Sequence, residues 1–145
     1  MPIRIPANQV QNLQQLETVV AGPDGANRLF IITGQFDAQF TAFANAQFGQ
    51  QINETFSVLI GPVLTRQGFF RAVSTAAIAK TTIGFQVAPG NFICGISDID
   101  ADWDDESGQV EVKIEAFVNA GGANNTMSIM GLSFQCTILA AVAGG

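Results

Sequence analysis

The residues whose type and spacing best suit chemistry are the acidic side chains of one short segment. Eight of the twelve acidic residues lie between positions 98 and 115, and Lys113 is the one basic residue among them. Carboxylate oxygens are the ligands that Ca²⁺ prefers in proteins. We expect the protein to need no cofactor, and the one alternative is a Ca²⁺ site formed by Asp98, Asp100, Asp102 and Asp104.

This segment departs from the EF-hand calcium loop. A loop starting at Asp100 would require glycine at its sixth position, where the sequence has Asp105. The flanking residues alternate with a period of two, whereas an EF-hand needs a helix on each side. We therefore favour a solvated hairpin whose charges keep the sheet edges of different molecules apart. A pair of acids for glycoside hydrolysis is the minor alternative, and nothing separates such a pair from surface acids.

Trp103 is the only tryptophan and stands beside the acidic segment. Its indole ring could stack on a sugar or anchor an interface. It could also cap the core, because Ile99, Ala101 and Trp103 would share one face of a strand. The chain has no His and no Tyr. Histidine-based nucleophilic and acid-base chemistry is therefore excluded, and we expect the protein not to be an enzyme.

Four phenylalanines are the candidate interface residues. Phe43 and Phe117 interrupt the polar faces of two alternating segments, and Phe69 and Phe70 are adjacent, so they cannot both point inward from a strand. The polar faces are also rich in Gln and Asn, whose amides are cheaper to bury than charges. Exposed aromatic groups are typical of interfaces. Self-association into a homo-oligomer is therefore the expected interaction.

The charge distribution bears on other partners. The chain has six basic and twelve acidic residues, a net charge of −6, and no basic patch. Nucleic acids and anionic membranes attract basic surfaces, so we expect neither as a partner. The apolar runs are too short to span a bilayer, and no secretory signal is visible near the first residue. We expect a soluble protein, and extracellular and particle-associated locations both remain open.

Hydrophobic alternation predicts the fold class. The chain has 145 residues, the size of one domain spanning 1–145. A period of two recurs in several segments separated by Gly- and Pro-containing turns, which is typical of antiparallel strands. The predicted strands are 36–48, 51–60, 81–87, 91–103, 109–120 and 126–141. We therefore predict an all-β protein, a jelly-roll-like antiparallel β-sandwich with at most one or two short helices.

Two segments have helical features. Asn8 could cap a short helix bearing Val10, Leu13, Leu16 and Val20, and residues 66–80 are rich in alanine. A helical interpretation also competes for 36–48, where Phe36, Phe40 and Phe43 are spaced by three and four residues. Cys94 and Cys136 are either one disulfide or two buried thiols, and we favour the thiols.

These observations favour a non-enzymatic structural or assembly subunit. It would form a homo-oligomer, fibre or particle coat through strand faces that carry amides and phenylalanines. The alternative is a lectin-like or Ca²⁺-dependent binding module that uses the acidic hairpin and Trp103, with a carbohydrate as ligand.

Overall fold

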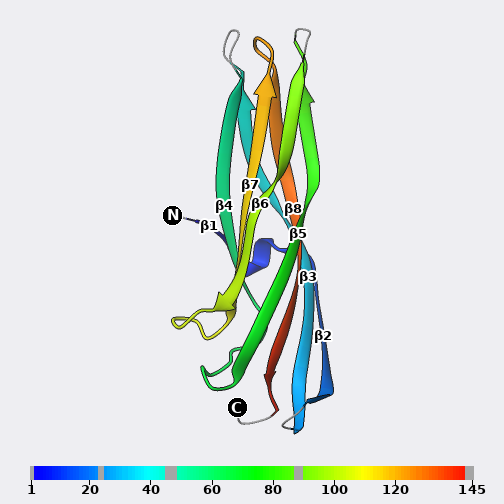
Figure 1. The fold of residues 1–145 in the computed structure, drawn as a ribbon, viewed down its shortest axis with the longest axis vertical. Helices are drawn as coiled ribbons and strands as arrows, with labels where there is room; N and C mark the ends of the chain where they lie inside the picture. The colour runs from blue at the N-terminus through cyan, green and yellow to red at the C-terminus, as the bar shows by residue number, and fades with distance from the viewer. Residues whose placement is uncertain (1, 23–24, 45–48, 87–89, 143–145) are drawn as a thin grey trace.

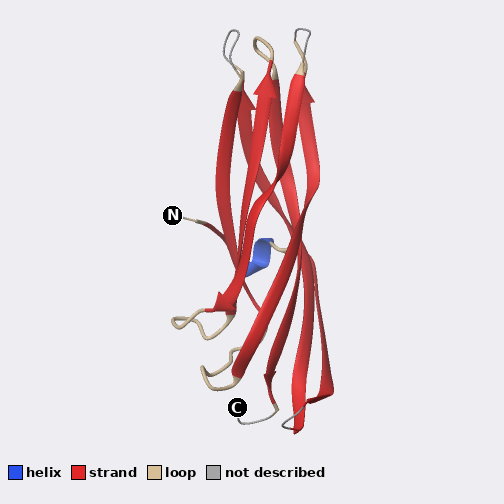
Figure 2. Ribbon diagram, in the orientation of Figure 1, coloured by secondary structure: helices blue, strands red, loops and turns tan. Residues whose placement is uncertain are grey.

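The computed structural model describes residues 2–22, 25–44, 49–86 and 90–142, and strands dominate these ranges (Figures 1 and 2). A single 3-10 turn, η1 (Ala7–Gln9), is the one helical element among the described residues. The strands are β1 (Ile3–Ile5), β2 (Gln11–Gly22), β3 (Gly25–Phe43), β4 (Gln50–Ile60), β5 (Phe69–Gly84), β6 (Asn91–Trp103), β7 (Val110–Gly121) and β8 (Thr126–Ala141).

The strands form two four-stranded sheets packed face to face. Sheet A has the order β1-β4-β7-β6, and sheet B has the order β2-β3-β8-β5. All pairs are antiparallel except the short parallel pair of β1 with β4. The prediction of an all-β sandwich is therefore confirmed.

The strand pairs are nested along the chain, as in a jelly roll. The pair of β3 with β8 encloses the pair of β4 with β7, and β5 and β6 lie innermost in the sequence. The described ends of β3 and β4, of β5 and β6, and of β7 and β8 lie at the upper end of the molecule, and the two strands of each pair belong to different sheets (Figure 1). Strands β3 to β8 thus form a jelly-roll-like arrangement within the described part of the chain. It has fewer strands than the eight of a usual jelly roll, because β1 and β2 are not part of the nesting.

The hydrophobic core lies between the two sheets and follows the period-two pattern. Four phenylalanines from both sheets meet at its centre. Phe36 lies 5.9 Å from Phe56 and 6.4 Å from Phe134, and Phe40 lies 5.8 Å from Phe56, measured between ring centroids. Alternate residues of β7 and β8 complete the core: Val110, Val112, Ile114, Ala116, Val118, Leu132, Cys136, Ile138 and Ala140.

Sheet B extends below sheet A in Figure 1. The lower part of its inner face is covered by the connection between β4 and β5, where Leu64 is buried. A methyl group at Gly61 would meet the side chains of Ile32 and Ile138 at 3.1 Å, which shows how closely this connection approaches the sheet. β2 lies at the edge of sheet B, beyond the region that this connection covers. No sheet of the described chain packs against β2, and nearly all of its residues are exposed.

The helical interpretations were wrong. Residues 11–22 form strand β2, and residues 69–84 form strand β5. Leu13 and Leu16 have helical spacing because nearly all of β2 is exposed, so burial imposes no alternation on it. The segment 36–43 is a strand, and residues 45–48 of the predicted strand lie outside the described residues. Cys94 and Cys136 are free thiols.

Candidate functional site

Trp103 joins two connections at the lower end of sheet A. Its indole Nε1–H donates to the carbonyl oxygen of Leu64 at 3.0 Å and to that of Gly108 at 3.1 Å. Leu64 belongs to the connection from β4 to β5, and Gly108 belongs to the turn from β6 to β7. The ring is half-buried and packs against the core. Its first role is therefore to cap the core and fix these two connections.

A hollow of about 260 Å³ remains beside the exposed part of the indole ring. It is lined by Trp103, Phe69, Arg66 and Asp102. The guanidinium carbon of Arg66 lies over the Trp103 ring, 6.0 Å from its centroid. Aromatic rings together with one cation and one carboxylate are groups that bind sugar rings and hydroxyls. The sequence singled out Trp103 as a ligand-binding residue, Phe69 as an interface residue and Asp102 as a calcium ligand; only the fold brings them together with Arg66.

The four candidate calcium ligands do not converge. Asp98, Asp100 and Asp102 are exposed along the outer face of β6, the face turned away from sheet B. Asp104 accepts hydrogen bonds from the backbone N–H and the hydroxyl of Ser107, which hold the pKa of its carboxyl below the ordinary value. Among the described residues, no three Cys, Asp or Glu side chains are placed to hold a metal ion. The arrangement gives the Ca²⁺ alternative no support.

The four candidate interface phenylalanines occupy different places. Phe43 and Phe70 are exposed to 45% and 50%, whereas Phe69 packs against the core. Phe117 is half-buried on the outer face of sheet A and lies over Gly95 of the adjacent strand, where a methyl group would meet its ring at 2.9 Å. Phe43 and Phe69 sit near opposite ends of β8. These rings therefore do not form one patch.

A continuous surface does exist on the lower outer face of sheet B, and we call it the neutral face. Residues that are directly opposed in the four strands make up its rows; one row, for example, runs Leu16, Ile31, Thr137 and Val73. Four residues from each strand belong to the neutral face: Gln11, Gln14, Leu16 and Thr18 of β2; Leu29, Ile31, Thr33 and Gln35 of β3; Ser133, Gln135, Thr137 and Leu139 of β8; Arg71, Val73, Thr75 and Ala77 of β5.

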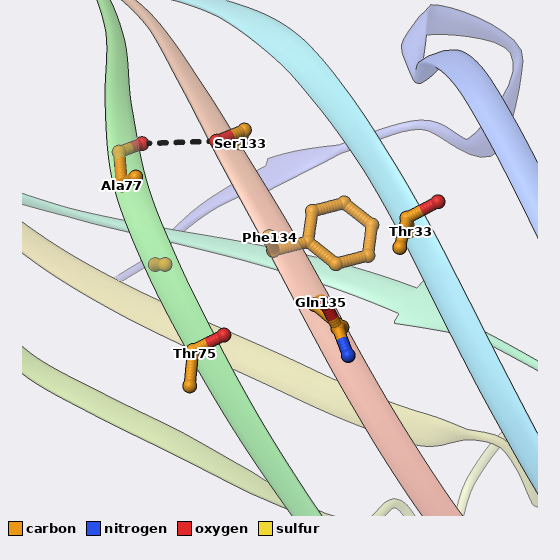
Figure 3. A pocket seen from close by; sticks show the side chains of 7 residues that line it. Thr33, Thr75, Ala77, Ser133, Phe134 and Gln135 are labelled. Atoms are coloured by element: carbon orange, nitrogen blue, oxygen red, sulfur yellow. Dashed lines mark hydrogen bonds between the residues drawn. The ribbon is translucent and has the colours of Figure 1, made fainter.

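Arg71 is the only charged residue of the neutral face. The neutral face has only shallow hollows. A hollow of about 250 Å³ lies at its centre between β3, β8 and β5, and Thr33, Thr75, Ser133 and Gln135 are among its lining residues (Figure 3). The Ser133 hydroxyl donates across the strands to the carbonyl oxygen of Ala77. The Gln35 amide likewise donates to the side-chain oxygen of Gln11, at 3.4 Å. Such hydrogen bonds within the sheet lower the cost of removing Ser133 and Gln35 from water.

The outer face of sheet A has the opposite character. Its rows carry Asp98, Asp100, Asp102, Glu111 and Glu115, with Lys113 and Arg4 as the basic partners. Arg4 and Lys113 both pair with Glu111. The strong negative charge of the chain is thus concentrated on one side of the sandwich and in the turn beside it, and the neutral face lies on the other side.

Comparison of the chain with protein-family models, with curated proteins and with solved structures gives no match. The described residues include no helix long and apolar enough to cross a membrane. Function is therefore argued from the surfaces themselves. The sequence indicated the neutral amides, such as Gln35 and Gln135, but not the neutral face, because only its β8 segment was predicted as strand; residues 11–18, 29–35 and 71–77 were not.

Proposed function

We propose that this protein is a non-enzymatic structural subunit that self-associates into a homo-oligomer, fibre or particle coat. The observation that carries the proposal is the neutral face, a flat surface on four strands with a single charged residue. In a chain of net charge −6, a surface of this size without acids is the side on which copies can approach.

The chemistry of the neutral face suits removal from water. Leu16, Leu29, Ile31, Val73 and Leu139 gain free energy when their apolar surface is buried. The remaining Thr, Ser and Gln side chains can exchange water for partners without the large penalty that burying a charge carries. Two sheets pack face to face at about 10 Å, so a sheet face that carries one charge among neutral side chains is suited to packing on a second sheet.

Light scattering after size exclusion at micromolar concentration tests the proposal. We expect an oligomer whose size falls on dilution. A monomer at every concentration up to the solubility limit would overturn the proposal.

A matched pair of substitutions locates the surface. Gln135→Glu places one negative charge at the centre of the neutral face, whereas Gln51→Glu adds the same charge to the outer face of sheet A. Burying an unpaired carboxylate costs several kcal/mol, so Gln135→Glu should raise the dissociation constant at least tenfold. Gln51→Glu should leave it within about twofold. Equal effects of both variants would contradict the assignment of the neutral face.

The hollow beside Trp103 supports a second candidate function, the binding of a carbohydrate. Trp103 itself is a poor test position, because its indole N–H holds two connections. Arg66→Ala leaves those hydrogen bonds intact and should abolish any signal on a glycan array. Arg71→Ala removes an arginine from the outer face of β5, away from the hollow that Phe69 lines, and should leave the glycan signal unchanged. The absence of binding by the unaltered protein across the array would remove this candidate.

A further inference from the structure

Strand β2 is an edge strand without the usual protection against pairing. It ends the order of sheet B, and no strand of the described chain pairs with its other edge. Natural edge strands are commonly protected by Lys, Pro, bulges or short length. β2 is 12 residues long, contains no Lys or Pro, and has a single charged residue, Glu17. Its one irregularity lies at the start, between Gln11 and Gln14.

The side chains of β2 are exposed on both faces of the strand. Leu13, Leu16 and Val19 are exposed to 49%, 68% and 61%, and Val20 and Gly22 are the only half-buried residues of β2. Such a strand exposes apolar surface together with a row of unpaired backbone groups. Both would be satisfied by one more antiparallel strand on the free edge.

A second copy of β2 can supply that strand through two-fold symmetry. A two-fold axis perpendicular to the sheet brings two β2 strands together in antiparallel orientation and keeps their outer faces on the same side. Because opposed residues share a face, even-numbered residues then pair with even-numbered residues of the second copy. Only registers centred on a single residue satisfy this condition, and the four nearest the middle of β2 are centred on Gln15, Leu16, Glu17 and Thr18. The register centred on Gln15 opposes Glu17 with the apolar Leu13 of the second copy.

The chemistry of opposed residues distinguishes these registers. Centring on Glu17 opposes the two Glu17 carboxylates, which is destabilising. Centring on Thr18 opposes Glu17 with the apolar Val19 of the second copy. Centring on Leu16 opposes Leu16 with itself, Gln15 with Glu17, Gln14 with Thr18 and Leu13 with Val19. In this last register, from Leu13 to Val19, every apolar residue faces an apolar residue and every polar residue faces a polar one; only at the ends does a polar residue face an apolar one, Asn12 opposite Val20 and Gln11 opposite Ala21.

The area of the neutral face also favours this arrangement. Four strands about 4.8 Å apart, each contributing a length of about 24 Å, give roughly 450 Å² of flat area. A standard interface buries about 800 Å² of accessible surface on each partner. Pairing through β2 joins two neutral faces into one continuous surface of about twice the area, which brings the surface into the range of a stable face-to-face interface.

We propose that two copies of this chain pair through antiparallel β2 strands in the register centred on Leu16, forming one eight-stranded sheet. This inference rests on the proposed self-association and specifies its first contact. Glu17 retains its ion pair with Arg28, at 3.6 Å, and in the dimer it also accepts a hydrogen bond from Gln15 of the second copy.

A disulfide trap tests the pairing. Directly opposed residues have Cβ atoms about 4.5–5.5 Å apart, close to the span of a disulfide. Leu16→Cys in a Cys94→Ser background should form a cross-linked dimer under mild oxidation. Val63→Cys in the same background is the control, because Val63 is exposed to 72% but lies in the connection between β4 and β5. Cross-linking of the Leu16→Cys variant alone supports the proposal.

The other outcomes separate this inference from the proposed function. An oligomer that persists while Leu16→Cys fails to cross-link overturns the β2 pairing and leaves self-association standing. Equal cross-linking of both cysteine variants reflects collision and also overturns the pairing. A protein that is monomeric by light scattering overturns both.

Charge substitutions at Gln15 test the register. In the register centred on Leu16, Gln15 faces Glu17 of the second copy at two symmetry-related places. Gln15→Lys should therefore lower the dissociation constant, and Gln15→Glu should raise it, each by about twofold to thirtyfold. In the register centred on Thr18, Gln15 faces Ala21 and neither change should alter it. Effects of the same sign, or no effect, would overturn the proposed register.

Discussion

Trp103 shows how one polar atom can fix a structure that has few charged contacts. Its indole N–H is shared between the carbonyl oxygens of Leu64 and Gly108, which belong to connections 44 residues apart in the sequence. The positive φ of Gly108, 75°, lets the turn bring its carbonyl to this position, and a side chain at Gly108 would strain it.

We predict that Trp103→Phe lowers the free energy of unfolding by about 1–3 kcal/mol, because a six-membered aromatic ring is kept while the five-membered ring is lost and the Leu64 carbonyl loses its indole donor. Urea unfolding followed by circular dichroism measures the change. A loss below about 0.5 kcal/mol would mean that water replaces the indole N–H and that these hydrogen bonds contribute little.

Cys136 gives a prediction about pH. Burial among apolar side chains raises the pKa of its thiol from 9.0 to about 12. The unfolded thiol therefore ionises between pH 9 and 12 while the folded thiol stays protonated, so this group contributes a decrease in stability as pH rises through that range. The expected slope is about 1.4 kcal/mol per pH unit.

Cys136→Ala removes this contribution and leaves the other titrations unchanged. Urea unfolding of both proteins at several pH values between 8 and 11 should give stability curves that converge as pH rises. Parallel curves would contradict the burial of an ionisable thiol at this position.

Phe117 shows what a sequence pattern can and cannot indicate about one residue. Its break in alternation correctly places the ring on the outer face of a strand. The sequence does not show that Gly95 lies beside it on the next strand, because cross-strand neighbours depend on register. Phe117 covers this glycine, so Phe117→Glu should affect the fold as well as any interface.

At the scale of elements, strands whose buried apolar face alternates with a polar face could be predicted, whereas β2, exposed on both faces, and the first part of β3, apolar on both faces at residues 29–32, could not. β6, β7 and β8 match the predicted segments 91–103, 109–120 and 126–141 within a residue or so. Their core residues alternate with polar ones because one face is buried. β2 has no such contrast, so its leucines suggested a helix. The neutral face depends on β2, on the first part of β3 and on the first half of β5, none of which was predicted as strand, and this explains why it was missed.

Hydrogen exchange should distinguish β2 from the other strands. β8 lies between β3 and β5 with both edges hydrogen-bonded, whereas β2 is paired on one edge. In dilute protein we expect fast exchange in β2 and the slowest exchange in β8. At concentrations that favour the oligomer, β2 should gain protection while β6, the edge strand of sheet A, should not. Equal gains in β2 and β6 would contradict pairing through β2.

At the scale of the molecule, the separation of charge predicts how salt affects assembly. An interface between neutral faces contains few ion pairs, while the acidic outer faces of sheet A repel one another. Salt screens this repulsion. The dissociation constant should therefore stay constant or decrease between 50 and 500 mM NaCl, measured by sedimentation velocity. A marked increase would indicate that oppositely charged surfaces hold the copies together.

The position of β8 in sheet B has a consequence for synthesis on the ribosome. β3 and β5 are not hydrogen-bonded to each other; β8 is inserted between them, and it pairs Asn27 of β3 with Ala141. Both neighbours are therefore translated before the strand that joins them. Until β8 emerges, the backbone edges of β3 and β5 that it joins have no partner. Exchange of β8 between neighbouring nascent chains on a polysome is therefore the misassembly that this strand order invites.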